Sequence, residues 1–499
     1  MRKYFLEVAV FVCGFSVMVF ELVGSRIFAP YLGTSLYVWT SIIGVILGSL
    51  SLGYWWGGRL ADRGATARFF SMLIALAALF LLIVVVFKFA ILVTMSVSTI
   101  DLRLRALLSA VLIFSPTSVA LGMISPYAVR LKVQTLAAAG QVVGNLYALS
   151  TLGSITGTFI AGFFLIAYVG TTNILLILAL ILFCTSLFVF WGDFKKIRIA
   201  GTALVILSLV ASNLLQGYVG QNAIVADVDT NYNRFQVVES IDAATNRPTL
   251  NLVSSREATQ AGMFMDNDDD LVYPYSKFYR LGDFFNPNIK QALMIGGGAY
   301  SYPKDFLKKH QNAHLDVVEI DPGVTFLAEQ YFNLKPSANL TIYHQDGRAF
   351  LNQLGAARYD AIYGDAFHSY FDVPFQLTTV EAVQKIASHL TDTGVYIVNI
   401  NSALGGERSK FLLAETATLE KVFPQVYRLP VTSTTDQDLL QNIMLVALKS
   451  SAVPDWSSAT GTVAAMLGHL QTKPLAKTMP ILTDDYAPIE NYILPLVKK

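Results

Sequence analysis

Long apolar runs, separated by short polar loops, make up most of the first 220 residues of the chain. A helix needs about 20 consecutive apolar residues to cross the hydrocarbon core of a bilayer. Seven runs reach this length, of which the third, interrupted by Lys88, and the last are the least regular. They lie near residues 4–24, 36–58, 69–96, 105–126, 141–168, 170–191 and 199–218. The pattern therefore predicts an α-helical membrane bundle of about seven spans over residues 1–220.

After residue 220 the apolar runs become short, and apolar and polar positions alternate. Residues 234–238 and 249–253 alternate with a period of two, which is typical of half-buried strands. We therefore expect a small β-subdomain over residues 221–286. From residue 287 to residue 499, buried strands alternate with helical segments, and this order predicts an α/β Rossmann-like domain with a mostly parallel sheet.

Basic residues are unevenly divided between the two sides of the predicted bundle. One side has Arg2, Lys3, Arg59, Arg63, Arg68, Arg130, Lys132, Lys195, Lys196 and Arg198, whereas the other has only Arg26, Arg103 and Arg105. The positive-inside rule places the first side, with the N-terminus, in the cytoplasm. Seven spans then put the α/β domain on the outer side of the membrane, and six or eight spans put it in the cytoplasm.

Small residues recur at intervals of four in the fifth apolar run, at Gly153, Gly157 and Ala161. Such a face lets two helices pack closely, which we favour over a substrate path. Glu21 and Arg26 lie near the end of the first run. An ionisable residue in a membrane is a functional candidate, but these two can also reach the interface, so both alternatives stay open.

Composition agrees with a membrane protein and excludes several other classes. Mean hydropathy is +0.50 and only 14% of residues are charged, so we expect the lipid bilayer as a partner. A net charge of +1 and the absence of basic runs argue against nucleic acid. Both cysteines lie in apolar runs, and the six histidines lack metal-ligand spacing, so we expect no disulfide framework and no metal.

A glycine-rich loop follows the buried strand at residues 292–295. Gly296, Gly297 and Gly298 let the backbone approach a ligand and open a helix. Glu319 ends the next strand, 23 residues after Gly296, where doubly wound folds place an acid that binds both ribose hydroxyls. This spacing predicts a nucleoside site, and the alternative is an inherited fold that no longer binds.

The chain resembles spermidine synthases, and within them a bacterial group that fuses such a domain to a multi-span membrane region. The matching blocks are residues 20–26, 295–301, 318–324, 346–347, 365–367, 373–379 and 483–488. The resemblance implies a class I transferase fold with seven strands. It also implies a multi-pass protein of the bacterial inner membrane. Whether the protein forms a homo-oligomer stays open.

The family transfers an aminopropyl group from decarboxylated S-adenosylmethionine to putrescine, so the resemblance implies an amine or polyamine as substrate. It implies that Glu319, Asp346 and Gly347 bind the nucleoside, together with the three glycines. Asp365 matches the acid that takes the proton from the attacking amine, and Gln260 and Tyr275 match substrate-binding positions. A carboxylate at that point can accept the proton and hold a cationic substrate.

The chain also departs from the family pattern. Ala299, Tyr300 and Ser301 replace Asp-Gly-Gly of the first loop, and His368 stands where the gate loop has a second acid. The family's motif for binding the diamine aligns with Tyr275-Ser276-Lys277. Lys277 then stands in place of a carboxylate, and its positive charge would repel a diamine. Asp484, Asp485 and Glu490 could bind a cation, although a cap before Pro488 is the favoured interpretation.

The leading hypothesis is a membrane-bound, spermidine-synthase-like transferase with a sulfonium nucleoside donor and an amine acceptor. Two alternatives remain. One is a methyltransferase-like enzyme that uses S-adenosylmethionine and another acceptor. The other is a non-catalytic transporter, sensor or assembly protein with a repurposed domain. A cytoplasmic α/β domain favours the enzymes, because adenosyl cofactors are made there, whereas an outside domain favours the non-catalytic alternative.

Overall fold

The computed structural model describes nine stretches of the chain, which are residues 4–33, 35–133, 135–189, 224–230, 232–255, 258–267, 270–366, 373–472 and 479–497. Contacts divide the chain into two compact units. The first comprises Met1–Gln221 and Val228–Arg234, and the second comprises Asn222–Asp227 and Phe235–Lys499.

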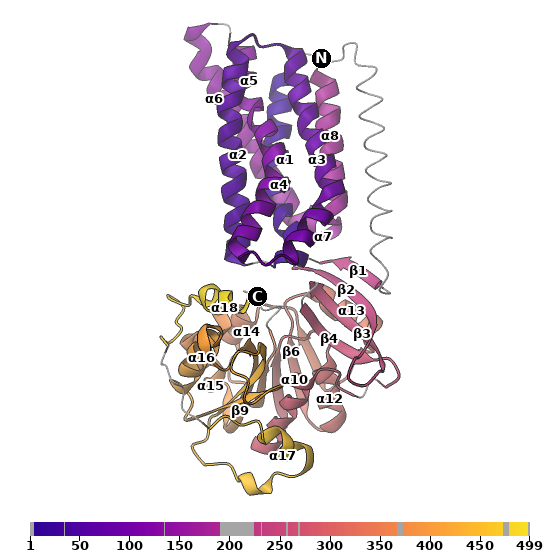
Figure 1. Ribbon diagram of the computed structural model, residues 1–499, viewed down its shortest axis with the longest axis vertical. Helices are drawn as coiled ribbons and strands as arrows, with labels where there is room; N and C mark the ends of the chain where they lie inside the picture. The colour runs from indigo at the N-terminus through magenta and orange to yellow at the C-terminus, as the bar shows by residue number, and fades with distance from the viewer. Residues whose placement is uncertain are drawn as a thin grey trace. The chain divides into compact units, whose positions relative to one another are not determined.

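The first unit is a bundle of long apolar helices (Figure 1). They are α1 (Phe5–Leu32), α2 (Leu36–Asp62), α3 (Ala67–Ser96), α4 (Leu102–Gly122) with α5 (Ile124–Lys132), α6 (Ala139–Ile160) with η3 (Ala161–Leu165) and α7 (Ile166–Tyr168), and α8 (Thr171–Val189). Within the described residues, six helical segments are long and apolar enough to cross a membrane. They correspond to the first six predicted runs, and the seventh, 199–218, lies outside the described residues.

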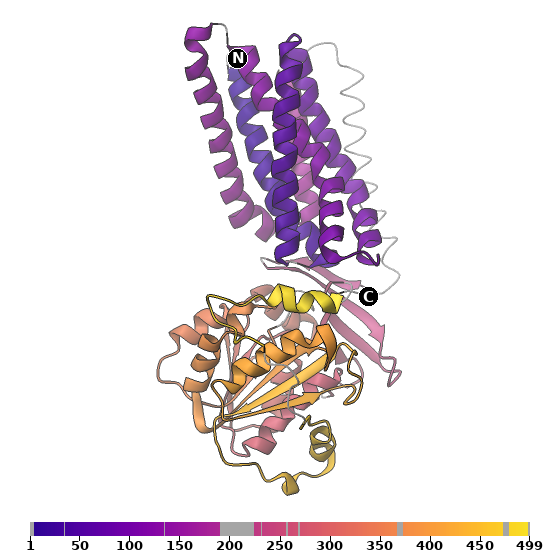
Figure 2. The ribbon, with the colours of Figure 1, turned by 60° about the vertical axis from the view of Figure 1, so that its left-hand side comes forward.

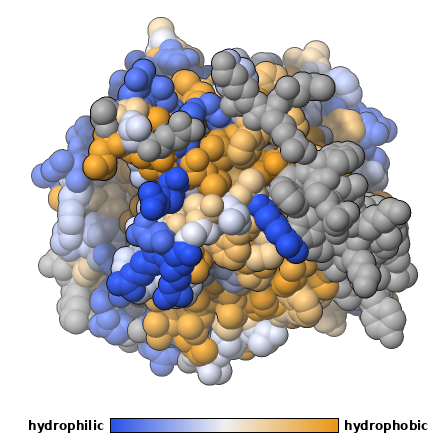
Figure 3. Space-filling view, turned by 90° about the horizontal axis from the view of Figure 1, so that it is seen from above, coloured by the Kyte–Doolittle hydropathy of each residue, from blue (hydrophilic) through white to orange (hydrophobic). Residues whose placement is uncertain are grey.

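Polar residues gather where the helices end. The end of the bundle that carries the N-terminus shows hydrophilic patches between hydrophobic ones (Figure 3). Arg130 and Asp62 form an exposed ion pair at 3.7 Å between the end of α5 and the end of α2. This distribution is the one expected for apolar helices joined by loops in water.

Close packing between α1 and α6 depends on glycine. A Cβ atom at Gly153 would lie 2.1 Å from the Phe11 carbonyl oxygen, and one at Gly157 would lie 2.5 Å from that of Phe15. Ala161 is fully buried one turn further along. The predicted small-residue face is therefore confirmed as a packing surface.

We expect Gly153→Ala to destabilise the bundle, because the added methyl would meet a backbone oxygen that cannot move away. The loss should be about 1–3 kcal/mol, measured as a lower thermal midpoint of the full chain in detergent. Gly144→Ala is the matched control on the same helix, since a Cβ there has nothing within 4 Å. Equal midpoints for the two variants would contradict the packing role.

Asp229 is bound to the end of the bundle that lies far from the N-terminus. Its Oδ2 accepts hydrogen bonds from the Thr171 amide at 3.2 Å and from the Thr171 hydroxyl at 3.3 Å. These residues share a small pocket with Val23 and Arg26 of α1. Lys88, which interrupts the third apolar run, donates to the neighbouring Thr172 hydroxyl at 2.7 Å. Its charge therefore has a polar partner at the helix end.

A small antiparallel sheet confirms the predicted β-subdomain. It contains β1 (Ile224–Asp229), β2 (Arg234–Ile241), β3 (Pro248–Ser255) and β4 (Ala258–Phe264), in the order β1-β2-β3-β4. β2 pairs with β3 and β3 pairs with β4 in antiparallel register. Two short helices, α10 (Pro274–Phe278) and α11 (Gly282–Phe285), follow it.

A seven-stranded sheet forms the centre of the second unit and confirms the Rossmann-like expectation. Its strands are β5 (Gln291–Ile295), β6 (His314–Val318), β7 (Leu340–Tyr343), β8 (Tyr359–Gly364), β9 (Leu390–Ser402), β10 (Gln425–Pro430) and β11 (Gln441–Leu448). The order is β10-β11-β9-β8-β5-β6-β7. The strands from β9 to β7 are parallel, whereas β11 is antiparallel to β9 and β10. The order reverses between β5 and β8, where doubly wound folds bind ligands.

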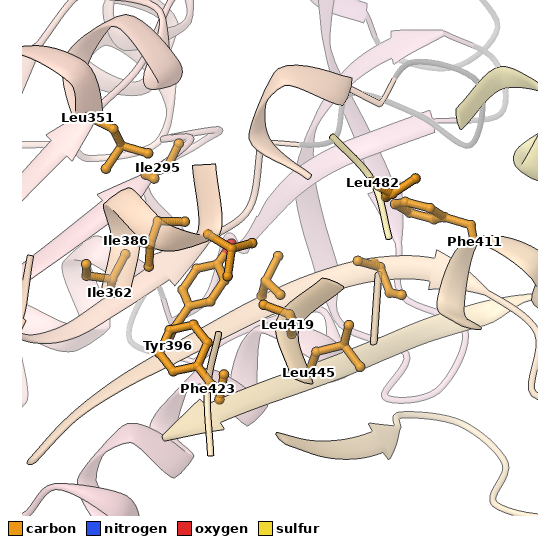
Figure 4. Close-up of a cluster of buried hydrophobic side chains, with 14 of the residues drawn as sticks. Ile295, Leu351, Ile362, Ile386, Tyr396, Phe411, Leu419, Phe423, Leu445 and Leu482 are labelled. Atoms are coloured by element: carbon orange, nitrogen blue, oxygen red, sulfur yellow. The ribbon is translucent and has the colours of Figure 1, made fainter. Parts of the chain in front are cut away.

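Helices cover both faces of this sheet (Figure 2). They include α12 (Ser301–Lys309), α13 (Pro322–Tyr331), α14 (Gly347–Gln353), α15 (Val380–Ser388), α16 (Lys410–Glu420), α17 (Gly461–Leu467) and α18 (Ile489–Val497). Leu293 and Ile295 face one buried cluster (Figure 4), and Ala292 and Met294 face the other. Both faces of β5 are thus buried, which explains its continuous apolar sequence.

Candidate active site

A cavity of about 620 Å³ opens at the carboxyl ends of the parallel strands in the second unit. All nine residues that the sequence assigned to nucleoside binding, substrate binding or catalysis line it. They are Gln260, Tyr275, Gly296, Gly297, Gly298, Glu319, Asp346, Gly347 and Asp365. The fold therefore brings the predicted residues together, while the role of each stays a prediction.

Glycine is required where the loop after β5 passes the end of β8. Gly296 has φ +97°, a conformation that side chains rarely adopt, and a Cβ there would lie 2.2 Å from the Asp365 carbonyl oxygen. The Asp365 amide also donates to the Ile295 carbonyl at 2.8 Å. Glycine thus allows the nucleoside loop and the predicted base to meet at the switch point of the sheet.

Glu319 is held rigidly beside this loop. Its side chain is 4% exposed, and its Oε2 accepts hydrogen bonds from the amides of Gly297 at 2.8 Å and Gly298 at 3.3 Å. Its Oε1 accepts from the Asp321 amide at 2.9 Å. Because a carboxylate has about four acceptor sites, three of which are occupied, it retains capacity for about one more donor. The geometry therefore suits one ribose hydroxyl in the cavity.

Asp346 caps a helix as well as lining the cavity. Its Oδ1 accepts from the Ala349 amide at 2.9 Å, which satisfies a free donor at the start of α14. Its Oδ2 accepts from Gln376 at 3.4 Å. At Gly347 a Cβ would lie 2.8 Å from the Ile295 side chain. This pair therefore has a structural reason to be present, in addition to the predicted nucleoside contact.

Asp365 follows β8 directly and lies half-buried among polar side chains. Its Oδ1 accepts from the Asn399 amide nitrogen at 3.2 Å. Burial raises the pKa of Asp365 to about 6, although hydrogen bonds with Asn399, Tyr275 and Tyr279 act to lower it. A carboxyl group with this pKa is ionised at pH 7 and accepts a proton more readily than an exposed aspartate.

Three asparagines that the sequence analysis missed orient this carboxylate. Asn442 donates to the side-chain oxygens of Asn399 at 3.0 Å and Asn401 at 3.1 Å. Since the ionised Asp365 only accepts, Asn399 must turn its nitrogen to Asp365 and its oxygen to Asn442. The available signal was Asn399-Ile400-Asn401, polar residues in an otherwise apolar strand.

The structure corrects the expectation that Lys277 repels the acceptor. Lys277 does not belong to the cavity lining, whereas Tyr273, Pro274, Tyr275 and Ser276 do. A helix turns by about 100° per residue, so in α10 Lys277 points away from the side that Tyr275 presents. The pKa of Asp242 is lowered by hydrogen bonds from Thr245 and, more weakly, by the charge of Lys277. The linear motif alignment therefore placed the lysine in the wrong environment.

The unusual residues after the glycines mostly pack away from the cavity. Ala299 and Tyr300 are fully buried, and the Tyr300 hydroxyl lies 2.7 Å from that of Thr325. Tyr300 has φ +55°, a left-handed conformation that favours glycine, so its buried ring and hydroxyl offset backbone strain. Ser301 lines the cavity and donates to the Gly262 carbonyl at 2.9 Å. The fourth departure, His368, lies outside the described residues.

The C-terminal tail is attached to the helices around the cavity. Asp484 Oδ2 pairs with Arg348 at 2.6 Å, and Asp484 Oδ1 accepts from the Thr379 hydroxyl at 2.6 Å. Asp484 therefore joins the tail to α14 and to the start of α15. Glu490, by contrast, lines the cavity itself.

Charge in the cavity has one sign. Its charged lining residues in the described part of the chain are Glu319, Asp346, Asp365 and Glu490, with no lysine, arginine or histidine. Carboxylates on a partly enclosed wall attract cations more strongly than they would in open water. The arrangement suits an organic cation. Across the stretches described, no three side chains of the metal-binding types come together.

Comparison with known proteins agrees with this geometry. Residues 276–452 match the family model of the spermine/spermidine synthase domain. A polyamine aminopropyltransferase of Vibrio vulnificus is 26% identical over 299 residues, which cover 57% of this chain and 97% of that protein. Polyamine aminopropyltransferase 2 of Ralstonia nicotianae is 23% identical over 444 residues, which cover 82% of this chain and 81% of the relative.

Among solved structures, a probable spermidine synthase from Corynebacterium glutamicum is similar with 19% identity and a TM-score of 0.40, over 47% of this chain and 85% of that one. The family match and the names of the relatives bear out the expectation of a transferase.

Proposed function

We propose that this chain, which carries a spermine/spermidine synthase domain at residues 276–452, is a membrane-bound transferase. It moves an aminopropyl group from decarboxylated S-adenosylmethionine to an amine. One observation carries the proposal. A single cavity is lined by the glycine loop, Glu319 and Asp365, without a basic residue in its described lining. Such a cavity suits a sulfonium nucleoside and an amine together.

The proposed mechanism divides the work between two halves of the cavity. The glycine loop, Glu319 and Asp346 hold the nucleoside, which leaves its sulfonium facing Asp365. The neutral amine attacks the carbon next to sulfur, so a C–N bond forms while the C–S bond breaks. The electron pair of the C–S bond returns to sulfur, giving a neutral thioether. Asp365 accepts the proton that the nitrogen loses.

Two measurements test this proposal with purified full-length protein. We expect calorimetry to detect binding of decarboxylated S-adenosylmethionine and methylthioadenosine, with the decarboxylated donor preferred over S-adenosylmethionine. We also expect transfer to an amine, detected as release of methylthioadenosine. Preference for S-adenosylmethionine would instead support the methyltransferase-like alternative. Absence of binding at millimolar ligand would overturn both.

Transfer should depend on pH through Asp365. Because its pKa is raised to about 6, the carboxylate is present above that pH and is lost as pH falls. We expect kcat/KM, which reports the pKa values of the free enzyme, to drop about tenfold per pH unit below this value. In Asn399→Ala this acidic limb of the pH profile should move to higher pH. The lost hydrogen bond normally lowers the pKa of Asp365. An unchanged limb in this variant would argue against Asp365 as the titrating base.

A second candidate is a non-catalytic membrane receptor for an organic cation, which the number of spans predicted from the sequence favours. With the N-terminus in the cytoplasm, seven spans would put the second unit outside. Adenosyl donors are made inside the cell, so an outside domain would need another source of donor.

The side of the membrane separates the two candidates. A single cysteine at Val453, which is 77% exposed, is introduced after Cys13 and Cys184 are replaced by alanine. Intact cells are then treated with a membrane-impermeant maleimide. Protection until the cells are opened supports the transferase, and labelling from outside supports the receptor. We propose the bacterial inner membrane as the location, with the membrane domain at residues 1–220.

A further inference from the structure

We propose that Glu21 is a proton-binding site inside the apolar bundle of the first unit. There it takes up and releases a proton, so the bundle carries an exchangeable proton of its own and is more than an anchor. The site rests on the proposed membrane location of the bundle and does not depend on the transfer reaction. It settles the role of Glu21, which the sequence alone left open.

Glu21 lies within the apolar part of α1. The helix begins 16 residues before it and ends 11 residues after it, so at about 1.5 Å per residue its N-terminal end is about 24 Å away. Arg26 marks the nearer polar level, about 8 Å further on, because it shares a small pocket with Asp229. Helical side chains tilt toward the helix N-terminus, so the Glu21 side chain leans away from that level. Its carboxyl group therefore stays in the apolar layer instead of reaching the interface.

Two glycines of α1 show which helices flank Glu21. A Cβ at Gly14, seven residues earlier on the same face, would lie 2.3 Å from a carbonyl oxygen of α6. A Cβ at Gly24, three residues later, would lie 2.7 Å from the Phe114 ring of α4 and 3.2 Å from Ile42 of α2. Glu21 is half-buried. It therefore lies on the strip of α1 between the contact with α6 and the contacts with α2 and α4.

The part of α6 that leads toward Glu21 is polar and irregular. The Ser154 hydroxyl donates to the Gly14 carbonyl at 3.2 Å, and the Thr158 hydroxyl, one turn further on, donates to the Ser154 carbonyl at 2.9 Å. Each hydroxyl keeps lone pairs that can accept a hydrogen bond. α6 then passes into the π-helical turn η3, which contacts α1, and such turns within helices frequently mark functional sites. Hydroxyl groups thus lead along α6 toward the carboxyl group, where a proton can pass between them.

Among the described residues, no hydrogen bond or ion pair occupies the Glu21 carboxyl group. Arg26 is turned by about 140° around α1 from it. Within their apolar parts, the flanking helices bring tyrosine hydroxyls, at Tyr54 and Tyr147, and no cation. The other ionisable groups of α2 and α4 lie at the helix ends, at Tyr37, Arg59, Asp62, Arg103 and Arg105. Because a carboxylate without a cation is costly in an apolar medium, the group takes up a proton.

An apolar carbodiimide tests the site. Full-length protein in lipid nanodiscs is treated with dicyclohexylcarbodiimide, which adds to protonated carboxyl groups. The carboxyl oxygen bonds to the central carbon and the proton moves to nitrogen, so nothing leaves and mass spectrometry detects the adduct. We expect an adduct at Glu21 at pH 7, formed about tenfold more slowly per pH unit once the carboxyl group ionises. Glu21→Gln should lose it, and Glu7→Gln should keep it, because Glu7 lies on the same helix but is paired with Lys132.

Infrared spectra of the same samples provide a readout that needs no reagent. The wild type should show the carbonyl band of a protonated acid that Glu21→Gln lacks, and this band should fade as pH rises. Absence of both the adduct and the band at every pH would overturn the proposal, as would an adduct whose rate of formation does not change with pH. A purely structural role would lower the thermal midpoint of Glu21→Gln and give neither signal. Failure of the proposed transfer reaction would leave both readouts unchanged.

Discussion

Asp365→Asn is expected to lower the rate of aminopropyl transfer by about 10²–10⁴-fold, the range typical of a lost general base. Asparagine keeps the shape of the side chain and can still accept the hydrogen bond from Asn399. It cannot take up a proton, so the nitrogen has no base to which it can lose its proton during transfer. Binding of methylthioadenosine should remain within about twofold, since the nucleoside half of the cavity is unchanged.

The control is Asp392→Asn, which removes the same charge at an exposed position at the start of β9. Single-turnover kinetics with saturating donor isolate the chemical step. If Asp365→Asn retained more than about a tenth of the wild-type rate, proton transfer to Asp365 would not be the mechanism.

Glu319→Gln is expected to weaken binding of the nucleoside donor by about 10–100-fold, because a hydrogen bond from a ribose hydroxyl to a carboxylate contributes about 1.5–3 kcal/mol. A neutral amide also offers one acceptor oxygen instead of two. The amide nitrogen would also face a backbone donor, because Gly297, Gly298 and Asp321 all donate to the present carboxylate.

The contact between the new amide nitrogen and these backbone donors could unfold the glycine loop. The thermal midpoint must therefore be measured together with the affinity. Glu329→Gln is the matched control, an exposed change of equal charge on α13. A Glu319→Gln variant that melts like the wild type and binds methylthioadenosine with unchanged affinity would remove Glu319 from the nucleoside site.

The elements of this protein could largely be predicted because they depend on local pattern. Run length predicted the six described helices of the first unit, since a bilayer requires about 20 apolar residues. Strand β5 and the loop at Gly296 followed from an apolar strand and a glycine run with a correctly spaced acid. The order of the seven strands depends on pairings between distant segments, which no local pattern encodes.

The candidate site was predicted in part for the same reason. Glu319 and Asp365 each follow a strand, where parallel sheets place their ligands. Asn399 and Asn442 meet only because β11 pairs with β9 in one register, so their contact was invisible in the sequence. Lys277 was misplaced because a linear alignment ignores the turn of a short helix.

The attachment of the tail has a consequence for biosynthesis. Asp484 joins segments more than 100 residues apart, with separations of 136 residues to Arg348 and 105 to Thr379. Contacts of such long sequence separation form late in folding, and a chain leaves the ribosome from its N-terminus. The helices of the first unit are thus synthesised long before the cavity can close. Truncation or a bulky fusion at the C-terminus should leave the helices of the first unit intact and prevent completion of the cavity.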